Sequence, residues 1–205
     1  LINKAVDMGY RYIVVLAGMH DNLRSQTQER IDEGVIGRIT RNNVQSNIGI
    51  GKKQGWSADT KPMTSFDKDF GKQALTFDIL NEDVRIWVIK KNKSILTNVN
   101  QFLQNLIESN RSSEFVHQDE KGIERLAKIP LLVIDDEADQ ASINTKVIPI
   151  DEDGNPLEEY DPTAINQGIR SILNKFSAKT YVGYTATPFA NIFIKPDATE
   201  IRFGD

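Results

Sequence analysis

Four carboxylates occur within the five residues from Asp135 to Asp139. They come directly after the apolar run 131–134, which we expect to be a buried strand. Carboxylates crowded at a strand tip repel one another unless a cation sits among them, so the cluster is typical of a magnesium–phosphate site. An acidic loop that begins a helix is the simpler alternative.

The order of these acids assigns a role to two of them. The first acid at the strand tip can hold water-bound Mg²⁺ on a nucleotide, and the next can orient and polarise the water that attacks the γ-phosphate. These roles fall to Asp136 and Glu137, which we expect to be catalytic, with Asp136 binding the metal through water. Asp135 is then the last strand residue, and Asp139 links the site to neighbouring loops.

A second polar cluster, Thr185-Ala186-Thr187-Pro188, follows the segment 180–184, which we expect to be a strand. If this segment and 131–134 are neighbouring strands, the hydroxyls of Thr185 and Thr187 can hydrogen-bond the carboxylates. Pro188 would then stiffen the exit from the strand. A threonine-rich turn is the simpler alternative, but a helical segment between the two clusters favours the paired interpretation.

Apolar runs rich in β-branched residues predict strands, and amphipathic segments between them predict helices. Strands are expected at 12–17, 84–89, 131–134 and 180–184, and helices at 1–6, 23–32, 99–107 and 165–176. This alternation predicts one α/β domain over residues 1–205, with a mostly parallel sheet flanked by helices. Ligands bind such sheets at the carboxyl ends of the strands, where both polar clusters fall.

The remaining segments are less regular. Residues 34–73 are rich in Gly, Asn, Lys and Ser, which predicts a loop-rich insertion with one short strand at 35–40. In the helix expected at 23–32, Leu23, Thr27 and Ile31 share one face. Further elements are expected as a short helix near 123–127, a hairpin at 147–155 and a short strand at 191–194.

Composition excludes several classes of function. The 205 residues include no Cys, which rules out disulfide scaffolds, thiolate zinc sites and cysteine nucleophiles. The two histidines, His20 and His117, are too far apart in the sequence to suggest a histidine-rich metal site. A net charge of −4 argues against attachment to nucleic acid by bulk charge, although it allows a local basic groove. No apolar run is long enough to cross a membrane, so we expect a cytoplasmic protein.

The two polar clusters together resemble motifs of a known class of enzymes. The segment 136–139 is similar to motif II (Walker B) of superfamily 2 helicases and translocases, and 185–187 is similar to their motif III. The longer strings 133–142 and 184–191 resemble the Z-one domain family, large bacterial proteins described as endonucleases with a helicase-like ATPase core. The segments 16–26 and 88–93 are similar, more loosely, to motifs Ia and Ib.

This resemblance implies the first RecA-like lobe of a P-loop NTPase that uses ATP and Mg²⁺. It also implies that Asp139, Thr185 and Thr187 couple hydrolysis to movement. The partners it implies are DNA, a second RecA-like lobe of the same polypeptide, and restriction-modification or defence proteins, with no membrane. Nucleic-acid contacts are implied in the two strand-end loops, at Gly18, Asn22, Arg24, Lys91, Asn92 and Lys93.

The sequence departs from the family in one motif. No phosphate loop of the form Gly-x-x-x-x-Gly-Lys-Ser/Thr occurs in the 205 residues. In the family this loop precedes motif Ia by one helix, and residues 1–6 resemble the end of such a helix. We therefore expect a lobe truncated at its N-terminus. Without the amides and lysine of that loop, the fragment alone is expected to be inactive and to bind ATP weakly, whereas the full-length protein hydrolyses nucleoside triphosphates.

Two other functions stay open on the sequence. The acidic cluster could act directly as a metal-dependent phosphodiesterase that cuts DNA, as the endonuclease description of the family suggests. Such sites usually need a Lys or His close to a second acid, and no such partner is evident in the sequence. A non-catalytic nucleic-acid-binding domain is the third alternative, but retention of Asp136, Glu137, Thr185 and Thr187 speaks against it.

Overall fold

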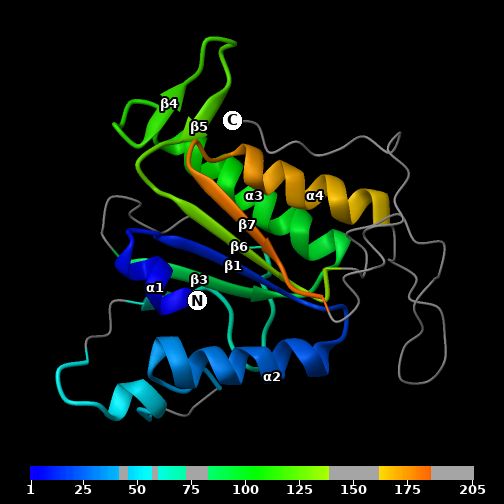
Figure 1. Cartoon of the computed structure of the whole chain (residues 1–205). Coiled ribbons are helices and arrows are strands. Elements are labelled where there is room, and N and C mark those ends of the chain that lie inside the picture. Colours follow the sequence, from blue (N-terminus) through cyan, green and yellow to red (C-terminus); the bar gives the residue numbers. More distant parts are fainter. Residues whose placement is uncertain (42–45, 57–59, 73–82, 139–161, 186–205) are drawn as a thin grey trace.

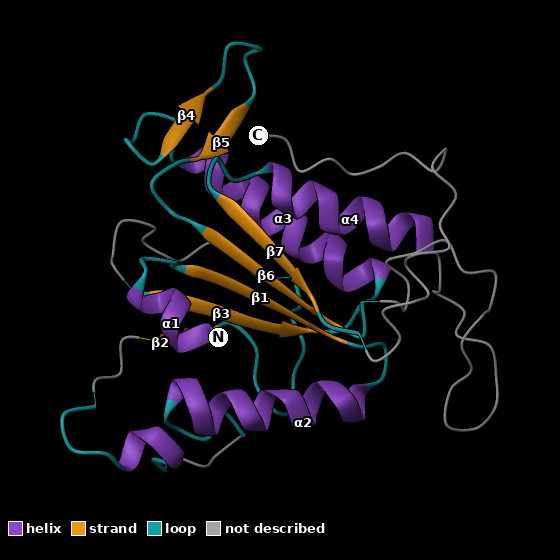
Figure 2. Ribbon diagram, viewed as in Figure 1, coloured by secondary structure: helices purple, strands orange, loops and turns teal. Residues whose placement is uncertain are grey.

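A five-stranded sheet forms the centre of the molecule, in the order β2-β3-β1-β6-β7, and every neighbouring pair of strands is parallel (Figure 1, Figure 2). The computed structural model describes residues 1–41, 46–56, 60–72, 83–138 and 162–185. The strands of the sheet are β1 (Tyr12–Ala17), β2 (Thr60–Pro62), β3 (Val84–Ile89), β6 (Leu131–Asp136) and β7 (Lys179–Gly183). The predicted α/β fold with a mostly parallel sheet is therefore confirmed.

Helices cover both faces of this sheet (Figure 1). One face carries α3 and α4 and the other carries α1 and α2; their bounds are Ile2–Asp7 for α1, Asp21–Ile31 for α2, Lys93–Ser109 for α3 and Pro162–Asn174 for α4. In β1, Tyr12, Val14 and Leu16 belong to the core beneath α3 and α4, whereas Ile13 and Val15 belong to the opposite core. Burial on both faces explains why the central strands are unbroken apolar runs. None of the helices described is long and apolar enough to cross a membrane.

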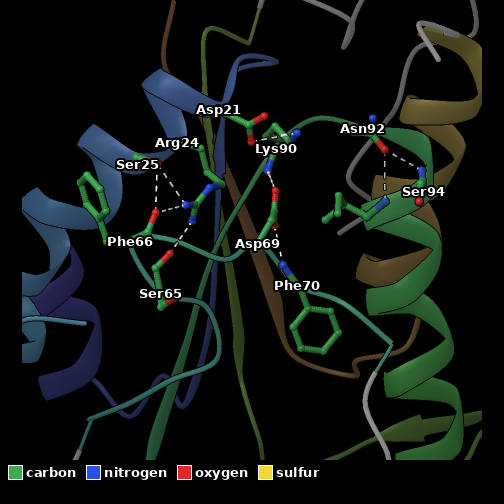
Figure 3. A network of polar contacts seen from close by, with 11 residues as sticks. Asp21, Arg24, Ser25, Ser65, Phe66, Asp69, Phe70, Lys90, Asn92 and Ser94 are labelled. Atoms are coloured by element: carbon green, nitrogen blue, oxygen red, sulfur yellow. Dashed lines mark hydrogen bonds and ion pairs between the residues drawn. The ribbon is translucent and has the colours of Figure 1, made fainter. Parts of the chain in front are cut away.

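The long helix α3 begins at a well-defined point after β3. The side-chain oxygen of Asn92 accepts hydrogen bonds from the backbone N–H groups of Ser94 and Ile95, at 2.8 and 3.2 Å (Figure 3). Such an N-cap satisfies donors that the first helical turn leaves unpaired. The predicted apolar face is buried, and its residues are Val99, Phe102, Leu103, Leu106 and Ile107.

The most deeply buried positions of α2 are polar, which differs from the expected face of Leu23, Thr27 and Ile31. Arg24 and Gln28 are buried, whereas Leu23 is 37% exposed. The reason is the segment 60–72, which packs along α2. Its backbone carbonyls accept hydrogen bonds from Arg24, and its Thr64 hydroxyl donates one to Gln28. Polar partners supplied by a distant segment cannot be read from the apolar periodicity of the helix itself.

The described part of the region 34–73 consists of turns and loops with one short strand, and the strand expected at 35–40 is wrong. A π-helical turn at Asp32–Ile36 ends at Gly37, whose φ of +76° redirects the chain. The chain then returns against itself, so that a Cβ on Gly51 would lie 1.7 Å from the Gly37 carbonyl oxygen. A single 3-10 turn covers Gly49–Lys52. The strand β2 also lies in this region, and its three residues are too few to show a pattern.

A small antiparallel hairpin, β4 (Val116–Gln118) and β5 (Glu124–Leu126), projects from the rest of the molecule (Figure 1). The short helix expected near 123–127 is therefore wrong. The carboxylate of Asp119 accepts hydrogen bonds from the backbone N–H groups of Lys121 and Ile123, which favours a turn over a helix. The hairpin expected at 147–155 and the strand expected at 191–194 lie outside the described residues.

Candidate functional site

The acidic cluster lies at the edge of the sheet where the parallel strands end. Asp136 is the last residue of β6 and is exposed, and Glu137 follows it and is half-buried. Asp136 Oδ1 accepts a hydrogen bond from the Glu137 backbone N–H at 3.2 Å. The strand register aligns Asp136 with Ala17 at the end of β1, and Asp135 with Gly183 at the end of β7. The two predicted catalytic carboxylates therefore stand at the tip of a strand that has neighbours on both sides.

Asp135 differs from Asp136 and Glu137 because its side chain is buried. The prediction ended the strand at Asp135, whereas β6 continues through Asp136. The Asp135 side chain is 0% exposed, and its Oδ1 lies 2.5 Å from Nζ of Lys91, which is also 0% exposed. Its Oδ2 accepts a hydrogen bond from the Tyr181 hydroxyl at 2.6 Å. A buried carboxylate requires partners of this kind, because its desolvation is otherwise uncompensated.

Lys91 has an interior role, although the resemblance implies a nucleic-acid contact at this position. Besides pairing with Asp135, its Nζ donates a hydrogen bond to the backbone carbonyl of Glu137 at 2.6 Å. Its backbone N–H donates to the carbonyl of Gly18 at 2.7 Å. Lys91 therefore joins the ends of β1, β3 and β6, and its ammonium group faces the interior of the protein.

Gly18, which follows β1, packs against Glu137. A Cβ added to Gly18 would lie 3.1 Å from Glu137 Oε2, and the φ of Gly18 is +60°. Both facts favour glycine, because a side chain here would meet the carboxylate and strain the backbone. Glu137 itself has a φ of +55°, which is uncommon for a residue other than glycine. The implied nucleic-acid contact at Gly18 is thus a buried position that touches a candidate catalytic side chain.

The exit from β7 is hydrogen-bonded to the same strand tip. The backbone N–H of Tyr184 donates to the Asp135 carbonyl at 2.8 Å, and the N–H of Ala138 donates to the Tyr184 carbonyl at 2.7 Å. These bonds hold the chain that leads into Thr185 beside the residues that flank Glu137. Thr187 and Asp139 lie outside the described residues, so the hydrogen bonds expected between the hydroxyls and the acids stay predictions.

The other implied nucleic-acid residues divide into exposed and buried ones. Asn22, in the first turn of α2, and Lys93, the first residue of α3, are exposed. Asn92 is half-buried and caps α3. Arg24 is buried and donates to the Ser65 carbonyl at 2.8 Å, so its guanidinium anchors the 60–72 segment (Figure 3). Asn22 and Lys93 are therefore the members of the set whose side chains are most open to a ligand.

Lys90 connects the loop after β3 to the start of α2. Its Nζ lies 2.9 Å from Asp21 Oδ1, and its backbone N–H donates to Asp69 Oδ2 at 3.1 Å (Figure 3). Burial raises the pKa of Asp69 above its usual value, while hydrogen bonds from the backbone N–H groups of Phe70 and Lys90 partly oppose this shift. The two loops that follow β1 and β3 are thus held together by ionic and backbone contacts.

The residues at the tip of β6 fit a magnesium ion that is shared with a nucleotide. Mg²⁺ keeps several of its waters and is usually bound by one or two carboxylates together with substrate phosphates. Asp136 offers such an exposed carboxylate. Within the ranges that the structure describes, no group of three or more acidic or His side chains could hold a metal by itself. Of the acidic side chains at this strand tip, that of Asp136 is the most accessible to such an ion.

The sequence-based reasoning missed the buried group formed by Lys91, Asp135 and Tyr181. A signal was present, because Lys91 closely follows the predicted strand 84–89 and Asp135 directly follows 131–134. In a parallel sheet the carboxyl ends of strands lie at one edge, so opposite charges at two strand ends can meet there. The identity of the partners required the strand order, which the sequence pattern does not provide.

The strand order, the parallel directions and the helices on both faces are consistent with a RecA-like α/β fold. Comparisons with family models, curated proteins and solved structures found no match to this chain.

Proposed function

We propose that this chain is the first RecA-like lobe of an ATP-driven DNA helicase or translocase. One observation carries the proposal: Asp136 and Glu137 are at least partly exposed at the tip of β6, a strand inside a parallel sheet, directly beside the exit of β7. Nucleotides bind at such strand ends, and adjacent Asp and Glu residues suit hydrolysis of a phosphoanhydride. The resemblance of 136–139 and 185–187 to motifs II and III supports the same function.

In this proposal Asp136 and Glu137 have separate tasks. Asp136 holds the hydrated Mg²⁺, which when bound neutralises negative charge on the nucleotide phosphates. Glu137 orients the water that attacks the γ-phosphate and polarises its O–H bond. The backbone of Glu137 is held by hydrogen bonds from Lys91 to its carbonyl and from its own N–H to Asp136, so its carboxylate is presented in a defined direction.

DNA would lie across the loops that follow β1 and β3. Asn22 and Lys93 are exposed there and can contact the phosphate backbone without reading the base sequence. These exposed polar groups lie at the edge of the sheet that also carries Glu137. Nucleic acid and nucleotide would therefore bind to loops that contact each other. This function also requires a phosphate loop and a second RecA-like lobe, together with ATP and Mg²⁺.

The phosphodiesterase alternative has weaker support. A lysine does lie beside an acid, but the side chains of Lys91 and Asp135 are both 0% exposed. A phosphodiester in solvent cannot reach this pair in the arrangement observed. The exposed carboxylate of Asp136 is compatible with either chemistry, so an experiment has to separate them.

The substitution Glu137→Gln in the full-length protein provides this test. We expect DNA-stimulated ATP hydrolysis to fall by about 10²–10⁴-fold, the range for loss of a positioned acid–base group. The control is Glu114→Gln, an equivalent change at a carboxylate that is 66% exposed near the β4–β5 hairpin, and it should leave the rate unchanged. Loss of DNA cutting with intact ATP turnover would instead favour the phosphodiesterase.

A further inference from the structure

Gly18, Lys91 and Glu137 lie together, and each of the three is close to the other two. The Lys91 N–H donates to the Gly18 carbonyl at 2.7 Å, and the Lys91 ammonium donates to the Glu137 carbonyl at 2.6 Å. The Glu137 carboxylate in turn packs against Gly18, with Oε2 3.1 Å from the position of a Cβ there. The loops after β1 and β3 are therefore both in contact with the residue that the proposed function makes catalytic.

The ammonium group cannot leave this position without a large cost. Nζ of Lys91 lies 2.5 Å from Asp135 Oδ1, and both side chains are 0% exposed. The Tyr181 hydroxyl donates to the other oxygen of Asp135 at 2.6 Å, which fixes that carboxylate from β7. Movement of Lys91 would leave an uncompensated buried charge, so the loop around Lys91 and the tip of β6 are expected to move together.

Glu137 occupies a backbone conformation that depends on its surroundings. Its φ of +55° is uncommon for a residue with a side chain and persists only where neighbouring contacts determine it. One such contact is the hydrogen bond from Lys91 to the Glu137 carbonyl. On the far side, the Ala138 N–H is held by the Tyr184 carbonyl. A shift of Lys91 would therefore change the direction in which the Glu137 carboxylate points.

We propose that Lys91 is a positioning residue that transmits nucleic-acid binding to Glu137. Lys93 is exposed, lies two positions after Lys91, and begins α3, so a phosphate bound there pulls on the loop that carries Lys91. The ammonium group then passes the displacement to the Glu137 carbonyl. Lys91 itself touches no nucleic acid. This inference rests on the proposed function and adds a regulatory connection to it.

The test compares two variants of the full-length protein with a duplex DNA that carries single-stranded tails. The double variant Lys91→Met/Asp135→Asn removes both buried charges together, which avoids a lone buried ion. We expect its stimulation by saturating DNA, the ratio of kcat with and without DNA, to fall on the order of tenfold, a typical coupling between two sites. Its Kd for DNA should stay the same. The matched variant Lys93→Ala should raise the Kd and also lower the stimulation at saturating DNA, because the phosphate that pulls on the Lys91 loop is bound there.

Several results would overturn the inference. A double variant whose hydrolysis falls equally with and without DNA would show that the pair only stabilises the fold, and a raised Kd would show that Lys91 contacts DNA. If the double variant does not fold, Tyr181→Phe keeps both charges and loosens Asp135, so unchanged stimulation in this variant would contradict the inference. A wild-type protein that hydrolyses no ATP would overturn the proposed function as well. If DNA stimulates ATP hydrolysis by the wild type and by the variants equally, the inference alone is overturned.

Discussion

Two ion pairs in this molecule use the same charged groups in opposite surroundings. Lys91 and Asp135 lie at the ends of β3 and β6, and both side chains are 0% exposed. Lys128 and Glu114 lie beside the β4–β5 hairpin, with side chains that are 59% and 66% exposed. Each pair joins a lysine to an acid that is distant in the sequence, so the main difference between them is access to water.

Access to water decides what each pair contributes. Water replaces a lost partner at the surface, so an exposed pair contributes little to stability and constrains the chain weakly. In the interior a lost partner leaves an uncompensated charge, so the chain must keep both groups in place. The buried pair can therefore define the geometry of Glu137, while the exposed pair leaves the hairpin free to adjust.

The largest loss of stability is expected for Asp135→Asn, which leaves the Lys91 ammonium buried without its counter-charge. The free energy of unfolding should fall by about 3–5 kcal/mol. Urea unfolding of this chain, followed by circular dichroism, measures the change. The double variant Lys91→Met/Asp135→Asn should recover a large part of the loss, because no single charge remains. A loss below about 1 kcal/mol, the level of a surface pair, would contradict the distinction by burial.

The hydroxyl of Tyr181 tests how much the carboxylate depends on its second partner. Tyr181→Phe removes one hydrogen bond to Asp135 Oδ2 and leaves both charges in place. Hydrogen bonds to charged groups contribute about 1.5–3 kcal/mol, so we expect a loss near the lower end, since Tyr181 is only half-buried. The same urea titration measures it. A change as large as that of Asp135→Asn would mean that the hydroxyl, rather than Lys91, holds the carboxylate.

Gly18→Ala tests the packing of the β1 loop against Glu137. A left-handed conformation costs a residue with a Cβ about 1–2 kcal/mol, and the contact with Glu137 Oε2 should add to this loss. Gly55 is the control, because its φ is +81° but no atom lies within 4 Å of a Cβ added there. Equal losses in Gly18→Ala and Gly55→Ala, measured by urea unfolding, would show that the Glu137 carboxylate moves aside freely.

The fold could be predicted from the sequence because its central elements are buried on both faces. The run 12–17 has no polar interruption, and the apolar face of α3 repeats with helical spacing. The predicted buried face was wrong where the stabilising contacts come from elsewhere in the chain. Arg24 and Gln28 are buried in α2 because the segment 60–72 supplies polar partners, and local periodicity carries no information about that segment.

The position of the acidic cluster at a strand tip could be predicted from the sequence, but not which of its carboxylates is buried. The run of acids after 131–134 indicated a site at a strand tip. Asp135, Asp136 and Glu137 have similar chemistry, and only burial shows that Asp135 is an interior partner of Lys91. Similarly, a lysine in a polar loop suggests a surface contact, and the strand order is needed to see that Lys91 faces inward.

A smaller effect is expected for Asn92→Ala, which lies next to Lys91 but acts on the helix. The variant removes the side chain that caps α3, and the loss of an N-cap costs about 1 kcal/mol. Asn92→Asp is the control, because Asp caps a helix as well as Asn and should keep most of the stability. Thermal unfolding of both variants makes the measurement. A loss of several kcal/mol would indicate that Asn92 also holds the Lys91 loop in place.

The smallest effect is expected for Glu114→Gln, the surface counterpart of Asp135→Asn. Both substitutions replace a carboxylate by an amide of nearly the same shape, and both remove the partner of a lysine. Since Glu114 and Lys128 are largely exposed, the stability should change by at most about 0.5 kcal/mol, and less at high salt, where the charges are screened. Urea unfolding at low and at high salt measures the stability change and its dependence on salt. A salt-independent loss comparable to that of Asp135→Asn would mean that burial is not what separates the two pairs, and that burial does not fix Lys91 against Glu137.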